Sequence, residues 1–161
     1  MIYLDQIEEV KPPHPEPFEG MSISPEELHL FIADSLKAGK QPVIIFGANW
    51  CPDAKYLAGV LELPSVKNFI DRHFLLLHVD VGKYERNTEL FNFFDSAIQD
   101  GIPRIFILNH AGEPINLEVN DQMRTARRAQ TLAFAAHVPC AARQPRIRRA
   151  RSRRAAAAMS T

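Results

Sequence analysis

The alternation of apolar and polar residues predicts strands and helices in regular succession. Continuous apolar runs at Val43–Phe46 and Phe74–Val81 are typical of buried strands. Between them, apolar residues at helical spacing predict a helix from about Cys51 to Leu61. Pro64 interrupts this pattern, and Ser65 is expected to cap a further helical piece.

Two more helices are predicted on either side of this strand–helix–strand unit. Ser24-Pro25-Glu26-Glu27 combines a Ser cap, a Pro at the first helical position and a Glu three residues after the cap. The apolar face that follows ends at Gly39, a typical helix terminator. A later helix, from Asn87 to about Ala97, is predicted from the apolar stripe Leu90, Phe91, Phe94 and Ile98.

The last predicted elements form a hairpin and a final helix. Gly101-Ile102-Pro103 is a turn into a third strand at Arg104–Leu108. A turn at 109–113 leads to a fourth strand at Ile115–Val119, and residues 123–138 are expected to form a helix. This order predicts an α/β fold, in which helices cover both faces of a central mixed sheet.

Charge and composition divide the chain of 161 residues into three parts. All 19 acidic residues lie in residues 1–121, whereas residues 122–161 contain ten arginines and no Lys, Asp or Glu. Four prolines among the first 17 residues predict an extended lead-in at 1–21. We expect a single folded domain at 22–138 and a disordered Arg/Ala-rich tail at 139–161.

The tail admits three interpretations that the sequence leaves open. It resembles GC-rich coding sequence read out of frame, it is a solvated tail that binds polyanions incidentally, or it is a nucleic-acid-binding arm. It has no aromatic residue for stacking on bases, so no specific nucleic-acid partner is predicted. Cys140, which lies in this tail, is interpreted as incidental.

Several function classes find no support in the sequence. No apolar run is long enough for a transmembrane helix, and no phosphate-binding loop or catalytic triad is recognisable. The six histidines lack metal-site spacing, so no metal is expected. No signal sequence is visible; a cytoplasmic location is expected as the chain stands, and a periplasmic one if an upstream signal peptide has been lost.

The main chemical signal is Cys51, in the sequence Asn49-Trp50-Cys51-Pro52-Asp53-Ala54. A cysteine at a helix N-terminus faces unpaired N–H groups and the positive end of the helix dipole, which favour the nucleophilic thiolate. The spacing is that of a Cys-x-x-Cys redox motif with Ala54 at the second position. Cys51 and Ala54 are expected to share one helix face, because they lie three residues apart.

Four separated motifs occur in a fixed order over roughly residues 22–120. They are Phe46-Gly47-Ala48-Asn49-Trp50-Cys51, Val79-Asp80-Val81-Gly82, Arg86-Asn87 and Ile98-Gln99-Asp100-Gly101-Ile102-Pro103. Together they resemble the thioredoxin superfamily, and within it a bacterial thioredoxin-like group often described as disulfide-isomerase-like. The resemblance implies a thioredoxin-like fold.

The resemblance also implies roles for individual residues. Cys51 would attack disulfides, and Pro103 would follow a cis peptide bond and lie against the thiol. Ile102 and Pro103, together with Trp50 and Pro52, would bind substrate. For Trp50, packing in the core is the alternative.

Three departures from the family pattern change the expected chemistry. Ala54 removes the resolving thiol, and Ile44-Ile45 stand where thioredoxins have a buried carboxylate that transfers protons. Arg104 follows Pro103, where it would place a cation near the thiol and favour the thiolate.

These observations predict a monomeric thiol–disulfide exchange protein with one nucleophilic cysteine. As an enzyme it would be an oxidoreductase or isomerase of reduced competence, acting on proteins that bear disulfides or thiols. No bound cofactor is expected, but an external thiol such as glutathione would have to resolve the mixed disulfide. One alternative is a thiol that is a relic or merely packed in the core, and another is a non-catalytic thioredoxin-fold module that binds peptides in the same groove. A third is a natural or deliberate Cys-to-Ala change at position 54 that traps partners on Cys51.

Overall fold

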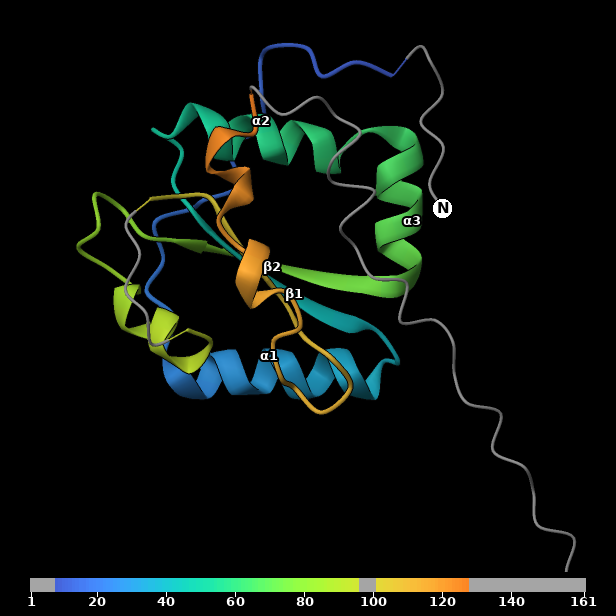
Figure 1. Cartoon of the computed structure of the whole chain (residues 1–161), viewed down its shortest axis with the longest axis vertical. Coiled ribbons are helices and arrows are strands. Elements are labelled where there is room, and N and C mark those ends of the chain that lie inside the picture. The colour runs from blue at the N-terminus through green and yellow to red at the C-terminus, as the bar shows by residue number, and fades with distance from the viewer. Residues whose placement is uncertain (1–7, 96–100, 128–161) are drawn as a thin grey trace, which may run out of the picture.

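The computed structural model describes residues 8–95 and 101–127 of the chain (Figure 1). Helices separate its first two strands, and its short 3-10 helices are labelled η. In chain order the elements are α1 (Pro25–Lys37), β1 (Gln41–Gly47), α2 (Pro52–Leu61), α3 (Pro64–His73), β2 (Phe74–Asp80), η1 (Thr88–Phe93), β3 (Arg104–Ile107), η2 (Leu117–Val119) and η3 (Gln122–Thr125).

The strands form a mixed sheet in the order β2-β1-β3. Strand β1 is parallel to β2 and antiparallel to β3, with Val43 paired to Leu76 on one side and to Ile107 on the other. The predicted parallel strand–helix–strand unit is therefore confirmed. Figure 1 shows α1 below the sheet and α2 above it, as expected for helices on both faces. The carboxyl ends of β1 and β2 meet the start of β3 at one edge of the sheet.

The central position of β1 accounts for its continuous apolar run. All seven of its residues are buried, because both sheet faces are covered and a strand pairs on each side. On the face toward α1, Phe46 stacks on Phe91 with ring centroids 4.2 Å apart, and Phe94 stacks on Phe106 at 4.9 Å. Strand β2 lies at the sheet edge and is partly exposed over five of its seven residues, so it is less covered than its apolar run predicts.

The prediction of a fourth strand at Ile115–Val119 is wrong, and the sheet has three strands among the described residues. A single bridge, between Leu108 and Pro114, follows β3. Beyond it, the side chain of Asn116 accepts a hydrogen bond from the Ile107 N–H at 2.9 Å and donates one to the Ile105 carbonyl at 2.8 Å. The Ile105 N–H donates to the Asn120 carbonyl at 3.1 Å, and the Ile107 carbonyl accepts from the Ile115 N–H at 2.9 Å. The Asn116 side chain and these two backbone groups together satisfy the strand edge that a fourth strand would have paired.

The helix predicted at Asn87–Ala97 is instead the six-residue 3-10 helix η1, and residues 96 and 97 lie outside the described part. Asn87 has a left-handed backbone, with φ of 54°, and does not cap the helix. Its side chain instead bonds Ile23, Met21 and Asp80. Without a cap, the segment tightens into a short helix that places Phe91 on the core.

The lead-in contributes to the fold although residues 8–21 contain no helix or strand. Phe18 is buried in the core, where its ring fills the space beside Gly47. The Glu8 carboxylate accepts from the Ser65 N–H at 3.0 Å and bonds its hydroxyl. Ser65 was predicted to cap α3, but the cap residue is Leu63, and Glu8 supplies an acceptor to the first turn.

Two predicted segments extend beyond the described residues. Of the last helix predicted, at 123–138, the described part contains only the 3-10 helix η3, and residues from 128 onward are outside it. The tail at 139–161 is outside it entirely. No helix in residues 8–95 and 101–127 is long and apolar enough to span a membrane.

Candidate functional site: Cys51 at the edge of the sheet

Cys51 lies where the polypeptide leaves β1 and enters α2. It is the N-cap residue of α2, with an extended backbone, and its N–H donates to the Ala48 carbonyl at 3.0 Å. The first intrahelical bond runs from the Lys55 N–H to the Cys51 carbonyl, so the N–H groups of Asp53 and Ala54 face the cysteine end of the helix. The Cys51 side chain does not cap the helix and remains available for other contacts.

The loop before β3 lies against the thiol. Cys51 Sγ is 3.6 Å from the carbonyl oxygen of Ile102, and the Ile102–Pro103 peptide bond is cis. Gly101 has a φ of +109°, which disfavours any residue with a side chain. The structure thus brings Cys51 together with both loop residues that the sequence singled out, and all three are buried.

The position of the second motif cysteine is buried in the structure. Ala54 lies in the first turn of α2 with 1% of its surface exposed. Cys51 itself is 6% exposed and is a free thiol. Cys140 lies outside the described residues, so the described part of the chain contains no second thiol.

Trp50 and Pro52, the residues on either side of the cysteine, are exposed. Trp50 has 52% of its surface exposed, so the alternative that it packs in the core is wrong. Its indole Nε1–H donates to the Gly82 carbonyl at 2.6 Å, and its ring meets that of Tyr84 at 63°, with centroids 6.1 Å apart. Pro52 begins α2 and is exposed at its N-terminus.

Residues 122–127 were missing from the predicted site. Figure 1 shows η3 packed beside α2, and Arg127 binds Asp53 through its backbone N–H at 3.0 Å and its guanidinium Nε at 3.2 Å. Arg124 lies against the Cα of Gly101, next to the cis peptide bond. These contacts join segments far apart in the chain, and no local motif signals them.

Arg104 is buried in the core rather than placed beside the thiol. It is 1% exposed, its guanidinium lies over the Phe91 ring at 5.6 Å, and Asp95 is 4.0 Å away. Burial lowers the pKa of Arg104, and the Asp95 carboxylate opposes that shift. In the register, Arg104 pairs with Phe46, whose ring faces the α1 side of the sheet. The contacts of Arg104 therefore give no support to its expected effect on Cys51.

The two motifs after β2 fix the loop that bears Tyr84. The Asp80 carboxylate accepts from the Gly82 N–H at 2.8 Å and lies 3.9 Å from Arg86. Arg86 also donates to the Gly20 carbonyl at 2.7 Å. Asp80 is thus a loop hydrogen-bonding residue, and Asn87 ties the same loop to the residues before α1.

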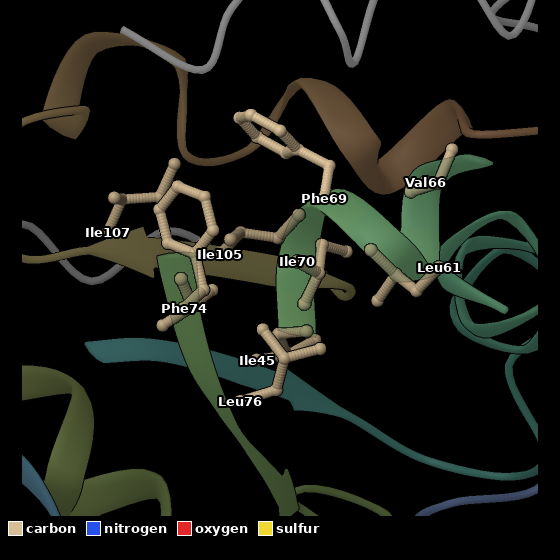
Figure 2. Close-up of a pocket in the computed structure, with 10 residues that line it drawn as sticks. Ile45, Leu61, Val66, Phe69, Ile70, Phe74, Leu76, Ile105 and Ile107 are labelled. Carbon is tan, nitrogen blue, oxygen red and sulfur yellow. The ribbon is translucent and has the colours of Figure 1, made fainter. Parts of the chain in front are cut away.

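The apolar pocket between the sheet and helices α2 and α3 is not a reactive site. Figure 2 shows side chains such as Ile45, Leu76 and Ile105 pointing into it. Its cavity is about 20 Å³, and every lining residue is apolar, so it suits neither a ligand nor a bound water. Within the described residues, no group of three His, Cys, Asp or Glu side chains is placed to hold a metal.

Comparison with known proteins agrees with this geometry. A family model described as thioredoxin-like matches residues 32–110. The chain is also similar to the crystal structure of a disulphide isomerase from Xylella fastidiosa Temecula1, with 26% identity and a TM-score of 0.67. That match covers 76% of this chain and 93% of the other. No curated protein matches the chain.

The central strand of the mixed sheet leads into a helix that begins at a cysteine, and the thiol of this cysteine faces a proline loop. This arrangement defines a thioredoxin-like fold. The fold and the family match identify the chain as thioredoxin-like, and it resembles a disulphide isomerase. In this sequence Ala54 stands at the position of the second motif cysteine.

Proposed function

We propose that the protein exchanges thiols and disulfides through Cys51 as its single nucleophile. The observation that supports this most directly is the 3.6 Å contact between Cys51 Sγ and the Ile102 carbonyl oxygen. It places the thiol between a helix N-terminus and the proline loop, where an incoming substrate chain can meet both the sulfur and backbone polar groups. The likeness to a disulphide isomerase supports the same chemistry.

In the proposed reaction, the Cys51 thiolate attacks one sulfur of a substrate disulfide. A new disulfide forms between Cys51 and that sulfur, the substrate disulfide breaks, and the second sulfur leaves as a thiolate with the bonding electron pair. Ala54 has no thiol to displace the bound substrate. An external thiol such as glutathione therefore has to complete the cycle, and it becomes oxidised in doing so.

A second candidate is a non-catalytic module that binds peptides in the same groove. The 52% exposure of Trp50, which directly precedes Cys51, suits peptide contact without any chemistry. The 6% exposure of Cys51 also favours this candidate, because a covered thiol reacts slowly. Partners in the exchange reaction would be thiol- or disulfide-bearing proteins. We expect the protein to act as a monomer.

The two candidates differ in whether Cys51 forms a covalent adduct. The full-length protein with Cys140→Ser, which isolates Cys51, is incubated with glutathione disulfide, and its intact mass is followed with time. Thiol–disulfide exchange predicts one added glutathionyl group, which reduced glutathione then removes. Cys51→Ser in the same background is the control and should gain no mass.

Absence of an adduct in the folded Cys140→Ser protein would refute the exchange proposal. If a peptide still bound that variant and the Cys51→Ser control with equal affinity, the binding module would be the better description.

A further inference from the structure

Trp50 and Tyr84 form an exposed aromatic pair beside the reactive cysteine. Trp50 is 52% exposed and Tyr84 is 44% exposed, and their rings meet edge to face at 6.1 Å. Single exposed aromatic residues are common, but two in contact create a continuous apolar surface whose hydration is unfavourable. Trp50 directly precedes Cys51, and the proposed exchange reaction uses no group of Tyr84.

The backbone that presents Tyr84 is unusual for a tyrosine. Tyr84 has a φ of 68°, in the left-handed region where Gly and Asn are favoured. A bulky residue in this region costs free energy, and such residues concentrate at functional sites. The Tyr84 N–H donates to the Val81 carbonyl at 2.8 Å, so the turn itself needs no aromatic side chain.

The sheet order places this pair on one side of Cys51 and the proline loop on the other. Strand β1 leads into Cys51 and lies between β2, which leads into the loop with Tyr84, and β3, which follows Pro103. All three connections lie at the same edge of the sheet. The indole of Trp50 also donates to Gly82 in the Tyr84 loop, which fixes the two segments together.

We propose that the ring of Tyr84, packed on Trp50, determines substrate specificity. A substrate chain that reacts with Cys51 contacts Ile102 and Pro103 on one side of the thiol. On the other side of the thiol, the substrate chain extends toward Trp50 and Tyr84. The pair would select substrates with a large apolar or aromatic residue next to the reacting cysteine. This inference rests on the proposed thiol–disulfide exchange and adds a substrate class to it.

The test uses two short peptides that contain one cysteine, activated as its mixed disulfide with 5-thio-2-nitrobenzoate. The peptides are identical except that Phe or Ser precedes the cysteine. The Cys51 thiolate attacks the peptide sulfur, a Cys51–peptide disulfide forms, and the coloured thionitrobenzoate leaves with the electron pair. Its absorbance gives the rate constant for each peptide in the Cys140→Ser background.

We expect the Phe peptide to react about fivefold faster than the Ser peptide, because an aromatic contact favours its approach. Tyr84→Asn should abolish that preference while retaining the left-handed backbone, which Asn tolerates. Tyr84→Gly is a second ring-deleting variant in case the first fails to fold. Tyr84→Phe should keep the preference, and the rate with iodoacetamide should stay unchanged in every variant.

Phe93→Ala is the matched control, because Phe93 is 47% exposed and packs on His29. Loss of the preference in this control would contradict the inference. Equal rates for both peptides with the unsubstituted Tyr84 would overturn it and leave the proposed exchange standing. Reaction with iodoacetamide but with neither peptide would instead refute the proposed function.

Discussion

Arg127 binds Asp53 with its backbone N–H and its guanidinium, although the two residues are 74 positions apart. Asp53 lies in the first turn of α2, two residues after Cys51. On the other side of the thiol, Arg124 of the same segment lies against Gly101. Residues 122–127 thus touch both segments that flank Cys51, and we expect them to restrict approach to its sulfur.

Arg127→Ala should therefore increase the rate at which iodoacetamide alkylates Cys51. An ion pair with an exposed partner is worth about 0.2–1 kcal/mol, which corresponds to an increase of up to about fivefold. The rate is measured by mass spectrometry in the Cys140→Ser background. Lys55→Ala is the control, because it breaks the ion pair of Lys55 with Glu16 on the same helix and should leave the rate unchanged. A rate for Arg127→Ala that matches this control would show that the segment does not limit access.

Ala54→Cys should create a dithiol that reduces disulfides repeatedly. The new thiol would lie one turn from Cys51 on the same helix and would displace the bound substrate without an external thiol. We expect insulin reduction at about ten times the unmodified rate or more, because the displacing thiol is at a high effective concentration. Ala58→Cys places a thiol one turn farther along α2 and should gain nothing. An inactive but folded Ala54→Cys protein would favour the binding module.

Asn116→Ala should destabilise the fold, because it leaves the Ile107 N–H and the Ile105 carbonyl unpaired in a buried place. A buried unsatisfied group costs about 1–3 kcal/mol, so we expect a loss of about 2–4 kcal/mol in the free energy of unfolding. Urea titration measures this loss. Asn109→Ala is the comparison: Asn109 bonds the Ala111 and Glu113 N–H groups in an exposed turn, so it should cost less. Equal losses in the free energy of unfolding would show that water satisfies the Ile107 N–H and the Ile105 carbonyl when the Asn116 side chain is removed.

Stability should fall as the pH falls below about 6.5, in part because of His78. Burial lowers the pKa of His78 from 6.5, so the unfolded chain binds a proton where the folded chain does not. The destabilisation begins near the unfolded pKa and is complete below the lowered folded one. His78→Gln should flatten the dependence of the melting temperature on pH between about 5.5 and 7.5. The exposed His110, replaced in the same way, should leave that dependence unchanged.

The fold was predictable where local pattern and tertiary structure agree. Strand β1 follows from a continuous apolar run, and helix α2 follows from apolar residues at helical spacing. The fourth strand was wrong because the Asn116 side chain and two irregular backbone groups satisfy the edge of β3, and no alternation of residues reveals this. The 3-10 helix η1 was read as an α-helix because its apolar spacing suits both.

The candidate site was predictable only along the motifs of the resemblance. Cys51 and Ile102 were named in advance because separate motifs contain them, and the structure brings them together. The pairing of Arg127 with Asp53 depends on how the chain returns to α2, which residue spacing does not encode. Arg104 was expected near the thiol because it follows Pro103 in sequence, but strand alternation directs its side chain to the other face.

The attachment of the lead-in determines where the protein can be cut or fused. The Asn49 side chain accepts from the Phe18 N–H and donates to the Phe18 carbonyl, and Asn49 immediately precedes Trp50, so Phe18 supports the loop that bears Cys51. A recombinant chain begun at residue 22 would lose that support, the Phe18 ring and the Glu8 acceptor together. Proteolysis within the lead-in would therefore change the reactivity of Cys51 without cutting any residue of its helix.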